Sequence, residues 1–301
     1  MLLFKPVTIE DKEIIQFFFN RVAFGNCDFS FSNIFSWRNI YNTTFAVKDD
    51  FLFFRFQPAG ELPGYLFPIG DENLKAGIDL VMQDADERAT ELCLYAITQK
   101  MFDMLEKAMP GQFIYEKDRD WYEYIYSSED LITLVGKKYQ PKRNHINKFK
   151  RIYKWEYLPI TMEIIPDCLK LYKRWCAENG GCNSEQSLIA EGIATQNAFQ
   201  NFENLGLTGG ALRIDGEILA YSYGQPLTKN IFGVHAEKCL YEIDGGFTMI
   251  NQAFAEHNCA AYTYINREED LGIESLRQAK MSYHPVTLLE KGMVKLKKMQ
   301  P

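Results

Sequence analysis

The predicted order of helices and strands in this chain occurs twice, and this repetition constrains the fold more than any other feature. Hydrophobic periodicity predicts, in each half, two helices, three sequential antiparallel strands, and then helix, strand, helix and closing strand. In the first half these elements are residues 11–20, 30–41, 45–47, 51–56, 65–69, 71–89, 92–97, 99–109 and 115–126. In the second half they are residues 167–177, 184–205, 209–214, 217–224, 231–238, 247–257, 261–265 and 272–281, and a strand from 286. No residue-level similarity accompanies the repeat, so it is one of structure only.

This order of elements matches the GNAT-like N-acetyltransferase fold, an analogy that concerns architecture and not chemistry. We therefore predict an α+β fold of two tandem GNAT-like lobes, each a mixed, mainly antiparallel sheet flanked by helices. Ser128, followed by two acids, is typical of the start of a helix, with Ser128 as its N-cap. Placing the boundary there gives an N-terminal lobe of residues 1–127 and a C-terminal lobe of 128–301, which we expect to carry the active site.

Composition excludes several classes of protein. The chain has 301 residues and a formal charge of -7, which argues against a protein that coats nucleic acid in general. No apolar stretch approaches the roughly 20 residues of a membrane helix, so we predict no integral membrane span and a cytoplasmic protein. The 7 cysteines include no Cys-x-x-Cys pair, which favours reduced, buried thiols over disulfides and predicts no metal site.

One local basic patch stands out against the negative net charge. Residues 137–154 hold eight cations and no acid: Lys137, Lys138, Lys142, Arg143, Lys148, Lys150, Arg151 and Lys154. Pro141 suits the first position of a helix, which puts Lys142 and Arg143 in the first turn. The helix dipole disfavours cations at that end but its free amides attract anions, so one interpretation is a phosphate or RNA-backbone site. The other is a solvated helix whose charge is balanced by acids elsewhere.

The helix predicted at 272–281 places two cations on an apolar stripe. Ile273, Leu276, Arg277 and Lys280 recur at the spacing of one helical face. A cation that faces inward needs a partner, because leaving it buried and unpaired costs several kcal/mol. Arg277 and Lys280 should therefore either meet carboxylates or line a cleft that receives an anion, and we favour the cleft. The preceding Glu268 and Glu269 are interpreted as acids that complement the helix dipole.

The strand predicted at 231–238 carries a candidate base. Alternation puts His235 and Glu237 on the same face. His235 is a candidate general base, with Glu237 as its orienting partner or as a ligand for a substrate ammonium group. The alternative is a structural histidine with satisfied hydrogen bonds.

Five motifs together resemble one family. They are residues 136–149 (GKKYQPKRNHINKF), 234–238 (VHAEK), 250–254 (INQAF), 266–272 (NREEDLG) and 282–285 (SYHP). In this combination the chain resembles uncharacterised bacterial proteins related to the C-terminal domain of phosphatidylglycerol lysyltransferases. That family is similar to the Fem-type aminoacyltransferases and implies a tandem GNAT-like protein. The resemblance maps the family's glycine, arginine, lysine and proline pattern onto Gly272, Leu276, Arg277, Lys280 and Pro285.

The resemblance implies transfer of an aminoacyl group from aminoacyl-tRNA, or another anionic activated donor, to an amine or hydroxyl. The acceptor would be a small molecule, a peptide or a lipid headgroup, and the tRNA 3′ end would be a partner. Expected catalytic residues are Arg277, Lys280, Glu237 and His235; expected donor-binding residues are Lys142, Arg143, Asn144, Asn266, Arg267, Gly245 and Gly246. No cofactor is assigned.

Two departures from the family keep alternatives open. The membrane-spanning N-terminal part of many lipid aminoacylases does not precede these motifs, which weakens the case for a lipid acceptor. The segment after residue 238 lacks the Arg/Gln-x-x-Gly-x-Gly/Ala loop that grips the pyrophosphate of coenzyme A, and its acids Glu242 and Asp244 would repel that group. A CoA-dependent N-acyltransferase is thus the second hypothesis. A non-catalytic sensor that docks through the basic patch is the third.

Overall fold

The computed structural model describes residues 1–58, 60–70, 73–179 and 186–297. The chain forms two compact units. The first comprises Met1–Glu123, Glu269–Glu274 and the chain from Leu288 on, and the second comprises Tyr124–Glu268 and Ser275–Thr287. Each contains a mixed sheet of seven strands flanked by helices, which confirms the predicted α+β class with two such lobes. The predicted division at residues 127 and 128 differs from these units chiefly in the C-terminal strand, which joins the first sheet.

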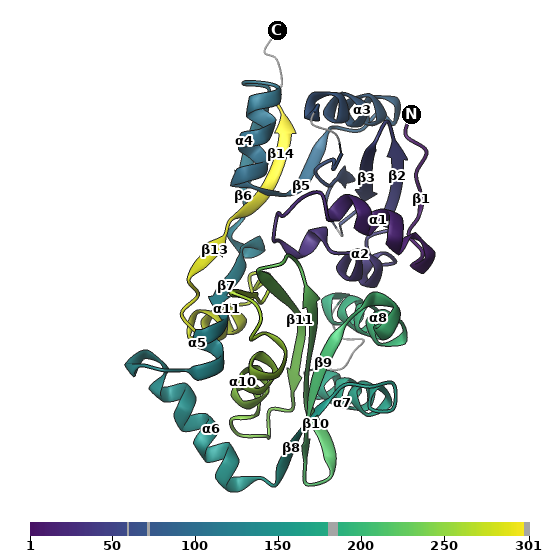
Figure 1. The fold of residues 1–301 in the computed structure, drawn as a ribbon. Coiled ribbons are helices and arrows are strands. Elements are labelled where there is room, and N and C mark those ends of the chain that lie inside the picture. The colour runs from purple at the N-terminus through teal and green to yellow at the C-terminus, as the bar shows by residue number, and fades with distance from the viewer. Residues whose placement is uncertain (59, 71–72, 180–185, 298–301) are drawn as a thin grey trace. The chain divides into compact units, whose positions relative to one another are not determined.

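The first unit has strand order β1-β2-β3-β4-β5-β14-β6. These strands are β1 (Lys5–Pro6), β2 (Thr44–Lys48), β3 (Phe51–Phe56), β4 (Gly64–Tyr65), β5 (Cys93–Thr98), β6 (Phe113–Lys117) and β14 (Lys291–Leu296). Its helices are α1 (Lys12–Phe19), α2 (Phe31–Trp37), α3 (Leu74–Glu87) and α4 (Gln99–Ala108) (Figure 1). The predicted helix 71–89 thus appears as α3, although residues 71 and 72 lie outside the described part. The core is aromatic: Phe53 and Phe54 are almost fully buried.

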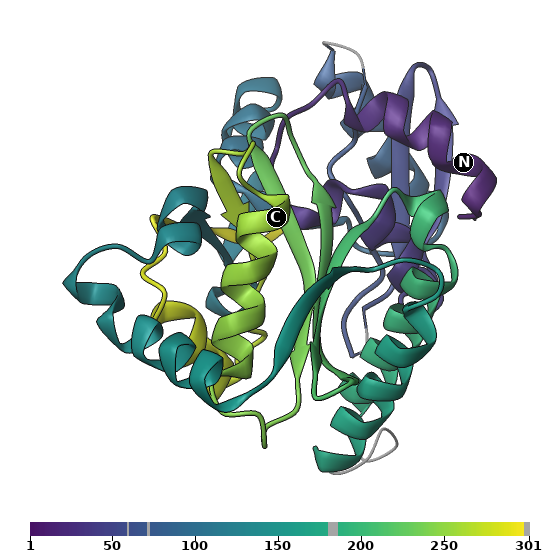
Figure 2. The same ribbon diagram turned by 60° about the horizontal axis from the view of Figure 1, so that its bottom comes forward.

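The second unit has strand order β13-β7-β12-β11-β10-β9-β8. These strands are β7 (Glu123–Ser127), β8 (Trp155–Pro159), β9 (Thr208–Ile214), β10 (Glu217–Pro226), β11 (Ile231–Cys239), β12 (Tyr264–Asn266) and β13 (Thr287–Leu289). Its helices are α5 (Ser128–Thr133), α6 (Gln140–Ile152), α7 (Ile165–Glu178), α8 (Gln186–Gln200), α9 (Phe202–Leu205), α10 (Gly246–Asn258) and α11 (Glu274–Met281). Helix α10 covers one face of this sheet and α7 and α8 cover the other (Figures 1 and 2).

Several predicted elements differ from the structure. The strand predicted at 65–69 is only the two-residue β4, and the strand predicted from 286 is divided into β13 and β14, which belong to different sheets. The strand predicted at 115–126 is two strands, β6 and β7, which belong to different sheets and are separated by a short 3-10 helix at Arg119–Trp121. The helix predicted at 184–205 is divided into α8 and α9, and residues 184 and 185 lie outside the described part. The N-cap of α5 is Ser127, whose hydroxyl accepts a hydrogen bond from the amide of Asp130, so the predicted cap at Ser128 is wrong by one residue.

Each sheet contains one strand, β14 in the first and β7 in the second, that is distant in sequence from the strand of the same sheet beside it. β14 follows β13 in sequence but lies between β5 and β6 in the first sheet. β7 follows β6 in sequence but lies between β12 and β13 in the second sheet. The two sheets therefore have the same internal plan, with an inserted antiparallel strand at the same place, which is the repeat expected from the sequence.

The strands β11 and β12 part early, and this separation positions the candidate site. They pair in parallel only at Ile231 with Tyr264, Phe232 with Ile265 and Gly233 with Asn266. Beyond Gly233, β11 continues for six residues to Cys239 beside β10 alone, whereas the chain after Asn266 turns away. His235 and Glu237 lie on this stretch of β11, beyond the end of its pairing with β12. Their side chains thus face the place where the parallel ladder ends.

The β10–β11 register depends on a glycine with no room for a side chain. A shift in register occurs between Tyr223 and Gly224, and a Cβ at Gly224 would lie 1.9 Å from the carbonyl oxygen of Gly233. We expect Gly224→Ala to lower the free energy of unfolding by about 1–3 kcal/mol, because the clash is with backbone. Urea unfolding of the purified protein checks this.

Gly192→Ala is the matched control for that substitution. Gly192 lies in α8, where an added Cβ would come no closer than 3.4 Å to the Tyr172 hydroxyl oxygen. Alanine favours a helix over glycine by about 0.5–1 kcal/mol, so this variant should be as stable as the wild type or more so. Equal stability of the wild type and Gly224→Ala would contradict the close packing at the register shift.

Candidate active site

A tight turn after β12 delivers two side chains toward β11. The Oδ1 of buried Asn266 accepts a hydrogen bond from the amide of Glu268 at 2.9 Å. The amide of Arg267 donates to the carbonyl of Tyr124, and the amide of Tyr124 donates to the carbonyl of Glu268. Glu268 has a φ of 56°, in the left-handed region that residues with a Cβ occupy at a cost of about 1–3 kcal/mol. Asn266, predicted as a donor ligand, thus shapes the turn.

The turn forms two side-chain pairs with β11. His235 Nδ1 lies 2.7 Å from Glu268 Oε1, and Arg267 Nη2 lies 3.0 Å from Glu237 Oε1. A carboxylate accepts, so Glu268 fixes the proton on Nδ1 and leaves the lone pair of the imidazole on Nε2. The predicted partner of His235 was Glu237; its carboxylate partner in the structure is Glu268, because Glu237 is bound to Arg267 instead.

Further polar and aromatic groups surround Glu237 and Arg267. Asn251 of α10 donates its Nδ2 to Glu237 Oε2 at 3.0 Å, and Ser222 of β10 is the register partner of Glu237. The Arg267 guanidinium lies 5.6 Å from the ring centroid of Tyr126 and 5.0 Å from that of Tyr283. Burial disfavours its charge, but Glu237, Tyr126 and Tyr283 together outweigh burial and raise the pKa of Arg267.

Three polar atoms in this group are buried without a hydrogen-bond partner. They are Ser222 Oγ, Asn251 Oδ1 and Arg267 Nη1. Buried polar atoms in folded proteins nearly always have a partner, in the protein or in water, because an unmet donor or acceptor costs about 1–3 kcal/mol. The cluster therefore has spare hydrogen-bonding capacity, which is a property of ligand sites.

Of the two cations predicted to face inward from α11, Lys280 is buried and Arg277 is partly exposed. Lys280 Nζ donates to the carbonyl oxygen of Arg267 at 2.6 Å and lies 5.6 Å from the Tyr124 ring centroid. Lys280 thus holds the turn in place by its backbone. The apolar half of the predicted stripe is wrong: Ile273 is 51% exposed and precedes α11, and Leu276 is 36% exposed.

The predicted donor ligands on α6 have different environments. Lys142 Nζ donates to Ser282 Oγ at 2.6 Å and lies 3.8 Å from the Tyr283 ring centroid, which places it in the same cluster as Arg267. Arg143 instead donates to the carbonyls of Leu134 and Gly136 and so caps the end of α5. Asn144 is exposed and accepts from Gln140 Nε2 at 2.8 Å.

Gly245 and Gly246, also predicted as donor ligands, have packing reasons to be glycine. Gly245 has a φ of 77° before α10, and a Cβ there would lie 2.7 Å from the carbonyl oxygen of His145. A Cβ at Gly246 would lie 2.4 Å from Cys239 Sγ. The acids of this segment are paired, Glu242 with Arg174 and Asp244 with Lys148.

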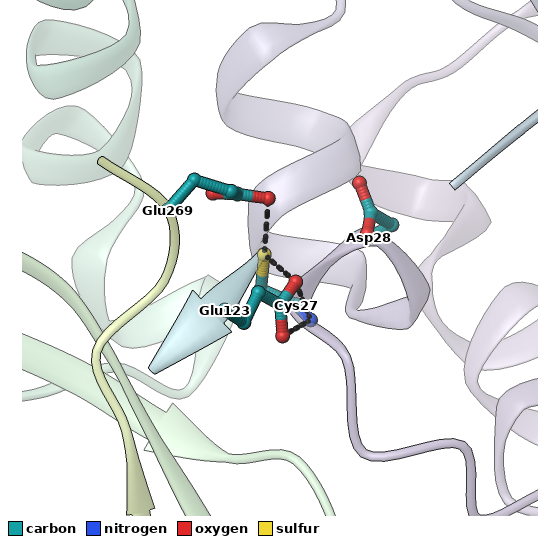
Figure 3. A group of neighbouring side chains, drawn as sticks. All are labelled: Cys27, Asp28, Glu123 and Glu269. Carbon is teal, nitrogen blue, oxygen red and sulfur yellow. Dashed lines mark hydrogen bonds between the residues drawn. The ribbon is translucent and has the colours of Figure 1, made fainter. Parts of the chain in front are cut away.

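A second cluster, which the sequence analysis did not predict, lies in the first unit (Figure 3). Cys27, Asp28, Glu123 and Glu269 offer donor atoms that all lie within 4.8 Å of one another, a set that could bind a metal ion. The Nζ of Lys291, which is 2% exposed, already binds this set: it lies 2.6 Å from Asp28 Oδ2 and from Glu123 Oε1, and it also contacts Glu269. An ammonium group thus supplies the positive charge that a metal would bring.

The charges in this second cluster do not balance. Burial raises the pKa of Glu123 to about 7, although Lys291 opposes this. Burial would lower the pKa of Lys291, but Asp28, Glu123 and Glu269 outweigh it and raise that pKa. Glu269 was interpreted from the sequence as an acid at a helix N-terminus; that is wrong, because α11 begins only at Glu274.

The residues missed by the sequence analysis are those whose partners are distant in the chain. Glu268 meets a histidine 33 positions earlier, and Lys291 meets a carboxylate 168 positions earlier. No local pattern reveals such pairs. The one available signal was the pairing of β11 with β12, which would have placed residues 266–268 beside 235–237. The six described cysteines are buried and unbridged, as predicted, and Cys182 lies outside the described residues.

Comparisons with known proteins agree with this architecture. The family model described as "Phosphatidylglycerol lysyltransferase, C-terminal" matches residues 19–295. A crystal structure of a conserved protein of unknown function from Bacteroides thetaiotaomicron is 46% identical, with a TM-score of 0.93 over 99% of this chain and 100% of that one. The L-PGS from Bacillus licheniformis is 16% identical, with a TM-score of 0.64 over 96% of this chain and 93% of that one, which shows a shared fold.

A curated relative gives a partial match. An uncharacterised protein of Mycoplasmoides gallisepticum is 28% identical over 177 residues, which is 58% of this chain and 56% of that protein. The fold is the predicted tandem GNAT-like one, and the family match suggests an aminoacyltransferase-like or GNAT-type acyltransferase. Among the described residues, no helix is both long enough and apolar enough to cross a membrane.

The raised pKa of Glu123 predicts a pH dependence of stability. The folded carboxyl keeps its proton up to about pH 7, whereas the unfolded one loses it near its ordinary pKa of 4.5. Between these values the folded state binds more protons, so stability should fall as pH rises. We expect Glu123→Gln, which mimics the protonated acid, to lack a decline of on the order of 1–3 kcal/mol that the wild type shows across this range.

Urea unfolding at pH 4.5–8 measures this difference. Glu116→Gln is the control, because Glu116 is 55% exposed in its pair with Lys295 and should follow the wild type. Parallel curves for the wild type and Glu123→Gln would show that Glu123 is ionised throughout the range.

Proposed function

Because the chain belongs to the family of phosphatidylglycerol lysyltransferase C-terminal domains, we propose that its second unit is an aminoacyltransferase. It moves an aminoacyl group from aminoacyl-tRNA, or another anionic activated donor, to an amine or hydroxyl acceptor. The observation that carries the proposal is the pair of contacts across the parted strands, His235 with Glu268 and Glu237 with Arg267. Adjacent positions of one turn, Arg267 and Glu268, thus bring a largely buried cation and the carboxylate partner of the base His235 to the same stretch of β11.

The residues support a direct transfer. His235 Nε2 takes the proton from the attacking amine or hydroxyl, while Glu268 holds Nδ1 and stabilises the imidazolium that forms. The new bond forms to the ester carbonyl carbon, and negative charge develops on the carbonyl oxygen. The ester bond then breaks, and the leaving hydroxyl takes up a proton from the imidazolium. No covalent intermediate with the protein is required.

We assign the stabilisation of that oxyanion to a cation on α11, the helix that follows the turn. Arg277, partly exposed on α11, is the group that contacts the developing charge, in a role worth about 3–4 kcal/mol for one well-placed donor. Lys280 is a positioning residue, because its ammonium holds the Arg267 carbonyl. Glu237 is a second positioning residue that orients Arg267. The acceptor is a small molecule, a peptide or a lipid headgroup.

The histidine gives the first test. We expect His235→Asn and Glu268→Gln each to lower the rate of transfer by about 10²–10⁴-fold, because general-base catalysis contributes that much. Transfer of a radiolabelled amino acid from a mixed pool of charged tRNA to cell-extract acceptors measures it.

His257→Asn is the matched control, since His257 stacks on Tyr157 at 3.9 Å between centroids on the same unit and has no role in the proposed site. Equal loss in all three variants, or none in the first two, would contradict the role of the pair.

Arg277 gives the second test. Arg277→Met should reduce transfer by about 10²–10³-fold while donor binding, measured by filter retention of charged tRNA, stays within a few-fold of the wild type. Arg213→Met is the control, because Arg213 forms an exposed pair with Glu156. Loss of binding in parallel with transfer would show that Arg277 holds the donor in the ground state instead.

The two alternative functions are separate outcomes of these assays. Transfer from acetyl-CoA but not from charged tRNA would favour a CoA-dependent N-acyltransferase. Binding of RNA without transfer from either donor would favour a sensor. Glu242 and Asp244, beside the start of α10, are paired with Arg174 and Lys148. The pyrophosphate of CoA at this helix start would have to compete with these acids for the two cations, which favours tRNA over CoA.

A further inference from the structure

Two cations of the second unit share one aromatic ring. Lys142 Nζ lies 3.8 Å from the ring centroid of Tyr283, and the guanidinium carbon of Arg267 lies 5.0 Å from the same centroid. Tyr283 is 5% exposed, so both cations sit against a largely dry surface. Like charges in such surroundings repel more strongly than they do in water. An anion beside them would relieve this repulsion.

Arg267 has a donor to spare. Its Nη2 binds Glu237, whereas its Nη1 is buried without a hydrogen-bond partner, and its side chain is only 11% exposed. The single carboxylate of Glu237 is also shared with Asn251. Glu237 thus binds Arg267 and Asn251 and acts on Lys142 only through its charge. The unmet N–H and the excess positive charge are independent observations, and both point to a negatively charged ligand.

Lys142 is the more accessible cation. Its side chain is half-buried, and the bond from Nζ to Ser282 Oγ uses one of its three N–H donors. The charged groups that act on it are Arg267 after β12 and Glu237 on β11, and Tyr283 supplies the ring. Burial, and then the charge of Arg267, lower the pKa of Lys142 to about 8. Glu237 opposes this without cancelling it.

We propose that Arg267 and Lys142 form a site for a phosphate diester, and that binding at this site takes up a proton on Lys142. The proposal rests on the proposed function, since the diester would be part of the anionic donor. A guanidinium N–H and an ammonium that approach from different elements suit a tetrahedral oxyanion. Lys150 and Arg151 in the last turn of α6 add positive charge to the same helix, which suits a polyanion backbone.

Proton uptake follows from linkage. Above pH 8 a growing fraction of free Lys142 is the neutral amine, and a bound diester favours the ammonium form. Affinity should therefore fall as pH rises, approaching tenfold per pH unit once most of the free lysine is neutral. A diester keeps one negative charge throughout this range, so the ligand itself contributes no pH dependence.

The test is direct binding of a short single-stranded RNA and of dimethyl phosphate to the full chain between pH 6.5 and 9.5, by calorimetry. We expect the wild type to bind both more weakly as pH rises above 8. Lys142→Arg should keep the affinity and lose the pH dependence, because a guanidinium stays charged. Lys142→Met should bind at least tenfold more weakly at pH 7, with no slope. Lys173→Arg, on the exposed face of α7, is the control and should match the wild type.

Each of the following results would contradict one part of the proposal. A flat wild-type pH profile, or an unchanged slope in Lys142→Arg, would overturn the uptake of a proton by Lys142. Acetate that binds as well as dimethyl phosphate would overturn the assignment to a phosphate diester. These readouts involve no turnover. If the transfer assays fail but the affinity falls with pH in the wild type and not in Lys142→Arg, the diester site is supported and the aminoacyltransferase is contradicted. If transfer is found without this pH dependence, the aminoacyltransferase is supported and the diester site is contradicted.

Discussion

The early parting of β11 from β12 is the constraint on which the second unit depends. Parallel strands satisfy each other's backbone groups only while they run together, and here they do so for three residue pairs. Past that point the strands are joined by side chains: a histidine with a glutamate, and a glutamate with an arginine. A regular sheet would have placed a backbone ladder there instead. The break in the ladder is what makes room for ionisable groups in the middle of a sheet.

Two cations, Lys291 in the first unit and Arg267 in the second, show two ways of neutralising charge. Lys291 in the first unit is surrounded by three carboxylates, so its charge is more than satisfied from within. Arg267 in the second unit has one carboxylate and an unmet N–H. Since a buried ion is stable only when it is well paired, Lys291 needs no further anion. Arg267 would be stabilised further by an anionic ligand. For this reason the functional proposals concern the second unit.

The sequence predicted the elements well and their long-range partners poorly. Apolar patterning located β3, β9 and α4 nearly to the residue, because α4 buries one regular face and β3 and β9 are short runs buried on both faces. It placed Lys280 inside, which is correct, but chose Ile273 for the same buried face, which is wrong, because α11 begins one residue after Ile273. It treated residues 115–126 as one strand, since a change of sheet within an aromatic run leaves no mark on the hydrophobic pattern. The pairs made by Glu268 and Lys291 depend on topology, which periodicity does not encode.

The position of β14 affects how the chain can fold as it is synthesised. Strands β5 and β6 of the first sheet are hydrogen-bonded to β14 on either side, and β14 is made after every strand of the second sheet. During synthesis, the edges of β5 and β6 that pair with β14 therefore stay unpaired until the rest of the chain has emerged from the ribosome. Domains usually fold in the order in which they are translated, and unpaired strand edges invite aggregation. In this chain the second sheet can close first, so the order of completion is reversed.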